Sequence, residues 1–260
     1  MKRLVFDGSA DVLKYIQKNE SSVRDFLRNN ERFVNYKTYD DIVKGLKLGI
    51  KDYNKNFIKE LKDIEDTNIE TNDYFFTDNG LFYDMQSVVD GLPECMLTTQ
   101  EDERKQLKIV ADYSYPAHTS NETINNRGIA LFKLFYTLIT RNYNLEIEFV
   151  TRIEHSYRSK NKNMDLIFKL PKNEINIPTI AYYCNVEFFR AVSCAIMENE
   201  GFDPDCCHSI SFVYDKNDFF VGGGYTDRET IRLTTVEKAD EFITDRFNKY
   251  LGERGMKWFL

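Results

Sequence analysis

Asp112 and Ser114 stand two residues apart, directly after the apolar run 109–111, and His118 and Thr119 follow close behind. Alternate side chains of an extended chain point to the same side, and open α/β sheets place their sites at the carboxyl ends of strands. A carboxylate and a hydroxyl are oxygen ligands of the kind that Mg²⁺ prefers. Two interpretations remain open: a Mg²⁺ site, or local hydrogen bonds through which Asp112 and Ser114 cap the loop.

The segment 107–153 is the one that must position this pair. Its strand at 109–111 is apolar on both faces, as a central parallel strand requires. A polar loop follows, and then apolar residues from 129 to 139 predict an amphipathic helix. Residues 145–149 alternate apolar and acidic side chains, which predicts a second strand. This spacing is typical of two parallel strands joined by a right-handed crossover.

Patterning outside that segment predicts further elements of both kinds. Beyond it we expect strands at 166–170, 209–214 and 230–233, and residues 219–221 paired with them or extending the sheet. A helix is expected over 179–199 with Gly201 at its end, and a last helix over 236–251 behind a capping box at 234–237. The N-terminal part predicts a short strand at 4–6, then helices from residue 9 and over 22–28. A capping box at 38–41 opens a helix to about 47, which is followed by a bend and a further helix to about 63. A short helix is expected over 81–89.

Together these elements predict the α/β class: a mainly parallel open sheet with helices on both faces, in residues 106–260. Residues 1–105 are expected to form an N-terminal helical region that packs on this core. Gly45 and Gly49 weaken the helix that contains them by about 1 kcal/mol each relative to alanine.

The loop sequence Asp112-Tyr-Ser114-Tyr-Pro116 resembles the metal-ion-dependent adhesion site of von Willebrand factor A domains, which reads Asp-x-Ser-x-Ser after the first strand. The helix and paired strand that follow also match the opening of that Rossmann-like fold. The resemblance implies a fold used mostly for protein binding, with a metal ion at Asp112 and Ser114. This chain departs from the pattern at the third ligand, where Pro116 replaces serine, and no later threonine or aspartate ligand is assigned.

A wider stretch, roughly residues 80–200, resembles a group of uncharacterised proteins encoded by tailed bacteriophages. The similarity is carried by GLPECML at 91–97, by Arg127, Gly128 and Ile129 at the start of the helix, and by Tyr143, Leu145 and Glu146 at the second strand. It implies a phage or mobile-element context and no reaction.

A basic cluster with one aromatic residue follows the second strand, and it consists of Arg152, Tyr157, Arg158, Lys160 and Lys162. Such a cluster can hold phosphates while the aromatic ring stacks on a base. The alternative is a solvated loop between two strands. The whole chain carries a net charge of -7, which is unusual for a protein that binds nucleic acid over its whole surface.

Composition bounds the class of protein. Hydrophobic residues make up 42% of the 260, enough for a packed core, and no apolar run has the length of a membrane span. Five cysteines, two of them adjacent, predict reduced thiols in the cytoplasm, which is the host cytoplasm for a phage protein. Cys206-Cys207-His208 lacks the spacing of a zinc site, and Cys194 is expected in the core.

No residue is assigned a catalytic role, because no Walker loop, Gly-x-Ser-x-Gly motif or helical histidine pair is present. The leading hypothesis is therefore a non-enzymatic protein-binding or assembly module whose partner surface includes Asp112, Ser114, His118 and Thr119. The alternative is a metal-dependent enzyme or nucleic-acid-processing factor that uses Asp112 and the basic loop 152–162. No cofactor is assigned beyond Mg²⁺ in that alternative, and the sequence leaves the oligomeric state open.

Overall fold

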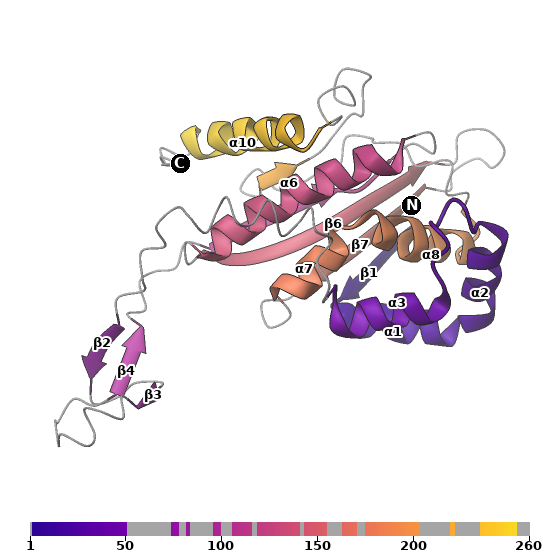
Figure 1. The fold of residues 1–260 in the computed structure, drawn as a ribbon, viewed down its shortest axis with the longest axis horizontal. Coiled ribbons are helices and arrows are strands. Elements are labelled where there is room, and N and C mark those ends of the chain that lie inside the picture. The colour runs from indigo at the N-terminus through magenta and orange to yellow at the C-terminus, as the bar shows by residue number, and fades with distance from the viewer. Residues whose placement is uncertain are drawn as a thin grey trace.

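The structure is a computed structural model, and it describes residues 2–50, 74–77, 82–83, 96–99, 106–115, 119–140, 143–154, 163–170, 175–202, 219–221 and 235–253. Its main sheet has five strands in the order β1-β7-β6-β5-β8 (Figure 1). These are β1 (Lys2–Asp7), β5 (Gln106–Asp112), β6 (Asn144–Glu154), β7 (Asn163–Leu170) and β8 (Phe219–Val221). A separate antiparallel sheet contains β2 (Tyr74–Thr77), β4 (Met96–Thr99) and β3 (Phe82–Tyr83).

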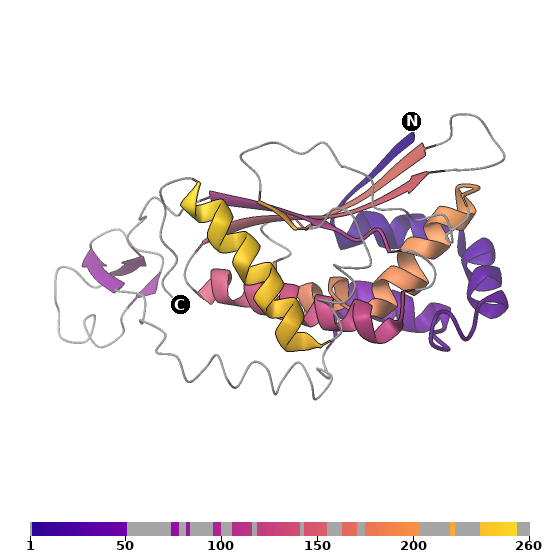
Figure 2. The same cartoon turned by 90° about the horizontal axis from the view of Figure 1, so that it is seen from above.

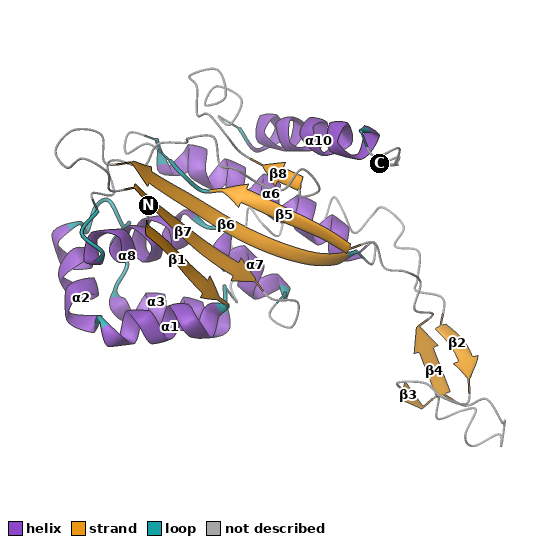
Figure 3. Cartoon of the chain, turned by 180° about the vertical axis from the view of Figure 1, so that it is seen from behind, coloured by secondary structure: helices purple, strands orange, loops and turns teal. Residues whose placement is uncertain are grey.

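The main sheet is mostly parallel, as the sequence predicts. β5 pairs in parallel with both β6 and β8, and β1 pairs in parallel with β7, while β6 and β7 form the antiparallel pair. Figure 3 shows β5 between β6 and β8. Ile109, Val110 and Ala111 expose at most 1% of their surfaces, so β5 is buried on both faces as expected. The α/β class and the mainly parallel open sheet are confirmed.

The helices are α1 (Ser9–Lys18), α2 (Glu20–Asn29), α3 (Tyr39–Leu48), α6 (Asn121–Thr140), α7 (Ile177–Tyr183), the π-helix η2 (Phe188–Ser193), α8 (Cys194–Asn199) and α10 (Val236–Gly252). We expected helices on both faces of the sheet, but the described helices lie on one (Figure 2). Phe6, Phe149 and Phe168 point to that face and join the large core, whereas Val110, Val150 and Ile167 form a small cluster on the other face. None of the described helices is long and apolar enough to cross a membrane.

The N-terminal segment contributes both a strand and helices to this architecture. β1 is hydrogen-bonded along β7 from Lys2 to Asp7, so the predicted short strand belongs to the main sheet. A capping box opens α3, as the sequence Thr38-Tyr-Asp-Asp41 predicts: the Thr38 hydroxyl accepts from the Asp41 amide, and the Asp41 carboxylate accepts from the Thr38 amide. The division at residues 105–106 stays a prediction, and the helices expected near 51–63 and 81–89 lie outside the described residues.

The predicted helix over 179–199 is divided in the structure. Asn176 caps α7, which ends at Tyr183, and Asn185 then accepts a hydrogen bond from the Glu187 amide at the turn into η2. The chain ends α8 at Gly201 with a φ of 79°, the left-handed geometry expected there. α10 is capped by Thr235, one position after the predicted Thr234. The strands expected at 209–214 and 230–233 lie outside the described residues.

Helix α7 packs against three glycines. This close packing explains why glycine, which weakens an isolated helix, occurs at these positions. A Cβ atom on Gly45 would lie 2.2 Å from the Tyr182 ring, and one on Gly49 would lie 2.3 Å from the Pro178 backbone. On the other side, a Cβ atom on Gly128 of α6 would lie 1.9 Å from the carbonyl oxygen of Cys184. The glycines therefore allow α3 and α6 to approach α7 more closely than any other residue would.

We predict that Gly128→Ala lowers the free energy of unfolding by about 1–3 kcal/mol, because backbone atoms must move to admit the methyl group. Urea denaturation measures this change. Gly252→Ala is the matched control, since no atom lies within 4 Å of its added Cβ, and its stability should be unchanged or slightly higher. Equal stabilities for the two variants would contradict the close contact of α6 with Cys184.

Candidate functional site

The candidate site lies where the chain leaves the carboxyl end of β5. Pairing with β6 continues past the strand, because the Tyr113 amide donates to the Val150 carbonyl over 2.6 Å. The Ser114 hydroxyl oxygen then accepts from the Arg152 amide over 2.8 Å. Ser114 and Arg152 come from two different predicted sites, and the structure brings them together through this bond.

The Asp112 side chain is also hydrogen-bonded to backbone, here to an amide of its own loop. One of its carboxylate oxygens accepts from the Ser114 amide over 2.9 Å, so the local hydrogen bond expected as an alternative is present. Asp112, Ser114 and Thr119 expose 3%, 0% and 8% of their surfaces. They therefore point inward, and among the described residues that follow, Ser120 and Glu122 are exposed.

Arg127 places a buried positive charge across this edge of the sheet. Its side chain is 2% exposed, and its Nη1 and Nη2 donate to the Tyr115 hydroxyl (3.3 Å) and to the Val221 carbonyl (3.0 Å). The guanidinium therefore joins the loop after β5 to the end of β8. Burial alone would lower the pKa of Arg127, but Tyr115 and the negative charge of Asp112 outweigh it and raise that pKa.

Arg190 anchors the far end of the same loop. It projects from η2, is 4% exposed, and its Nη2 donates to the Thr119 carbonyl over 2.6 Å. Its Nε donates to the Asn121 side chain over 3.3 Å, and its guanidinium carbon lies 4.1 Å from the centre of the Phe33 ring. The π-helical turn, a feature common at functional sites, thus presents a cation to the loop.

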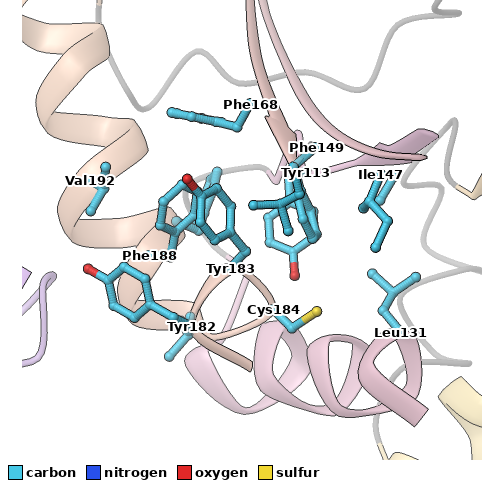
Figure 4. Close-up of a cluster of buried hydrophobic side chains, with 14 of the residues drawn as sticks. Tyr113, Leu131, Ile147, Phe149, Phe168, Tyr182, Tyr183, Cys184, Phe188 and Val192 are labelled. Atoms are coloured by element: carbon cyan, nitrogen blue, oxygen red, sulfur yellow. The ribbon is translucent and has the colours of Figure 1, made fainter. Parts of the chain in front are cut away.

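Residues behind the loop form a packed aromatic core. The Tyr113 ring contacts Tyr115, Phe149 and Phe189 edge to face. Figure 4 shows its buried hydroxyl directed toward Cys184, whose thiol is the polar group that acts on it. Burial raises the pKa of Tyr113 and of Cys184, which keeps both groups neutral. Cys194 is also buried, as predicted.

Arg152 belongs to an ion pair inside the sheet. Its Nε and Nη2 lie 2.6 Å and 2.9 Å from the two carboxylate oxygens of Asp165 on β7. A bidentate pair of this kind fixes the guanidinium against the sheet. Of the predicted site residues, His118, Tyr157, Arg158, Lys160 and Lys162 lie outside the described part of the chain.

Sequence reasoning missed Arg127 and Arg190 as site residues. Arg127 was singled out only through its resemblance to the start of a phage-protein helix. Arg190 stands in the apolar run Phe188-Phe-Arg-Ala-Val192, and a lone arginine among buried residues is the signal that could have identified it. Among the described residues, no three histidine, cysteine, aspartate or glutamate side chains are grouped as a metal site.

We predict that Arg190→Met lowers the free energy of unfolding by about 1.5–3 kcal/mol, because it removes charged hydrogen bonds and leaves the Thr119 carbonyl without this donor. Methionine preserves most of the packing of the stem. Amide hydrogen exchange near residues 119–124 should accelerate as well. Arg28→Met, at a side chain that is 73% exposed, should change stability by no more than about 0.5 kcal/mol. Unchanged exchange in Arg190→Met would contradict the anchoring role.

Comparison with known proteins places the chain in a family. A family model described as a domain of unknown function, DUF7192, matches residues 2–225. No curated protein and no solved structure matches the chain. The matched range includes every described element from β1 to β8, and with them Asp112, Arg127 and Arg190. The chain therefore belongs to the DUF7192 family.

Proposed function

We propose that the chain is a non-enzymatic protein-binding or assembly module whose partner surface is formed around the loop after β5. The supporting observation is that two buried arginines hold the described residues on either side of positions 116–118, Arg127 through Tyr115 and Arg190 through the Thr119 carbonyl. A loop fixed in advance loses little conformational entropy when a partner binds, which favours affinity. Backbone held by buried charged hydrogen bonds can present a fixed surface to a protein partner.

The chemistry of Asp112 also favours binding over catalysis in this proposal. A metal ligand or general base needs its carboxylate oxygens available to an ion or substrate. Here Asp112 accepts from a backbone amide, and the fixed charge of Arg127 acts on it from the neighbouring helix. We infer that Arg127 supplies the positive charge that a divalent cation supplies in the adhesion sites that the loop sequence resembles.

The biological setting is part of the same proposal. The resemblance carried by Arg127, Gly128 and Tyr143 supports a phage or mobile-element origin, and with it a role in the host cytoplasm. An assembly factor of this kind would act on a protein partner, and the von Willebrand A-like order of strand β5, helix α6 and strand β6 supports that choice by analogy.

The test is site-specific photocrosslinking in cells that contain the natural partners of the chain. A benzophenone amino acid replaces Glu122, which is exposed in the first turn of α6 beside the loop. We expect a discrete protein adduct, because Glu122 lies at the rim of the proposed surface.

Asp245, exposed on α10, is the matched control position for the same crosslinker. The adduct should be absent there and should weaken when Arg190→Met loosens the loop. A crosslink only to nucleic acid, or equal protein adducts from both positions, would contradict the proposed partner surface.

A further inference from the structure

A strained turn and the loop after β5 meet at the same short helix, η2. The turn over residues 30–38 connects α2 to α3, and it contains Asn35 and Tyr36, whose φ values are 55° and 56°. Asparagine tolerates this left-handed region, but a tyrosine there is rare and strained. Tyr36 is also 65% exposed, so the turn is accessible from solvent. Strain of this kind persists only where surrounding contacts maintain it, and it is concentrated at functional and switching segments.

Two side chains, one on each side of the strained residues, connect the turn to η2. Before them, the centre of the Phe33 ring lies 4.1 Å from the guanidinium carbon of Arg190. After them, the Lys37 Nζ lies 2.8 Å from a carboxylate oxygen of Glu187, the residue before η2. These two charged side chains are 30% and 26% exposed, so the protein partly shields the ion pair from solvent. Helix α2 also packs against α8, beside it in Figure 1.

Arg190 connects η2 in turn to the loop after β5. Its residue is 4% exposed, and its Nη2 donates to the Thr119 carbonyl over 2.6 Å. One guanidinium therefore contacts the Phe33 ring of the turn and the backbone of the loop at the same time. Movement of this guanidinium changes both contacts together.

The π-helical form of η2 has a discrete alternative. In the π turn the Cys194 amide donates to the Phe189 carbonyl, five residues earlier. An α-helix makes this bond to the residue four positions earlier, so a return to α geometry displaces one residue. The helix is interrupted at residues 184–185, shortly before η2, and this interruption can accommodate the displaced residue. The change would rotate Arg190 about the helix axis by about 100°, away from the Thr119 carbonyl.

We propose that η2 is a conformational switch that couples the strained turn to the loop after β5. Phe33 and Lys37 hold η2 in its π form, and in that form Arg190 fixes the Thr119 carbonyl. Relaxation of the strained turn withdraws both contacts and releases the loop. The turn and the loop then bias one two-state element, which is the physical requirement for coupling between two sites. Regulation of the partner surface by this switch rests on the proposed function, whereas the coupling itself does not.

The test is amide hydrogen exchange of the full chain, followed by NMR at residues 119–124 and on α10. Lys37→Met removes the ion pair with Glu187, so the strained turn should relax. Exchange at residues 119–124 should then become roughly two- to fivefold faster, while exchange on α10 stays unchanged. Lys47→Met, the same substitution at an exposed position of α3, should leave both regions at the wild-type rate.

Tyr36→Gly separates this coupling from a simple loss of stability. Glycine adopts a positive φ without strain, so the turn should keep its form even without the ion pair. The double variant Tyr36→Gly with Lys37→Met should therefore exchange at the wild-type rate at residues 119–124. A general gain in stability would instead slow exchange on α10 as well.

Three results would overturn the proposal. The first is wild-type exchange at residues 119–124 in Lys37→Met. The second is equally accelerated exchange on α10, which would make the change global. The third is failure of Tyr36→Gly to restore the rate in the double variant. A missing protein adduct at Glu122 would leave all of these exchange results in place, so the coupling and the proposed partner surface fail separately.

Discussion

The buried guanidinium of Arg127 is the interaction on which the edge of the sheet depends. It lies between the loop after β5 and the end of β8, and it is bonded to Tyr115 and to the Val221 carbonyl. A buried charge without hydrogen-bond partners costs much free energy. The groups that contact Arg127 must therefore keep their positions for the guanidinium to stay buried. The negative charge of Asp112 also raises the pKa of Arg127, so the guanidinium and the Asp-x-Ser loop interact electrostatically.

Helix packing brings that charge to its place. Gly128 follows Arg127 directly, and its missing side chain lets α6 approach the carbonyl of Cys184 at the end of α7. Gly45 and Gly49 allow α3 to approach the same short helix from the other side. The η2 turn then carries Arg190 from this helical layer to the Thr119 carbonyl. The loop is thus held by charges whose positions are set by close helix contacts.

Periodicity in the sequence was sufficient to predict the unit of β5, α6 and β6, the capping box at Thr38 and the end of α8 at Gly201. These features are encoded locally, by residues a few positions apart. The partner of Arg127 at Val221 is 94 residues away, and no local pattern indicates such a contact. The π-helix and the placement of the described helices on one face were missed for the same reason, because tertiary packing decides them. The local bond from the Ser114 amide to Asp112 was one of the two interpretations open from the sequence. The burial of both side chains and the bond of Ser114 to the Arg152 amide depend on β6, which no local pattern indicates.

Arg127 is the cation that we propose acts on Asp112 in place of a divalent ion. Thermal melting of the wild type and of Asp112→Asn, each with EDTA, Mg²⁺, Mn²⁺ or Ca²⁺, tests this most directly. A cation that binds only the native state adds about 2.7 kcal/mol of stability at a hundredfold excess over its Kd. The account predicts the same melting temperature for each protein under all four conditions. A cation-dependent rise in the wild type that Asp112→Asn loses would contradict it and would make the loop an ion site.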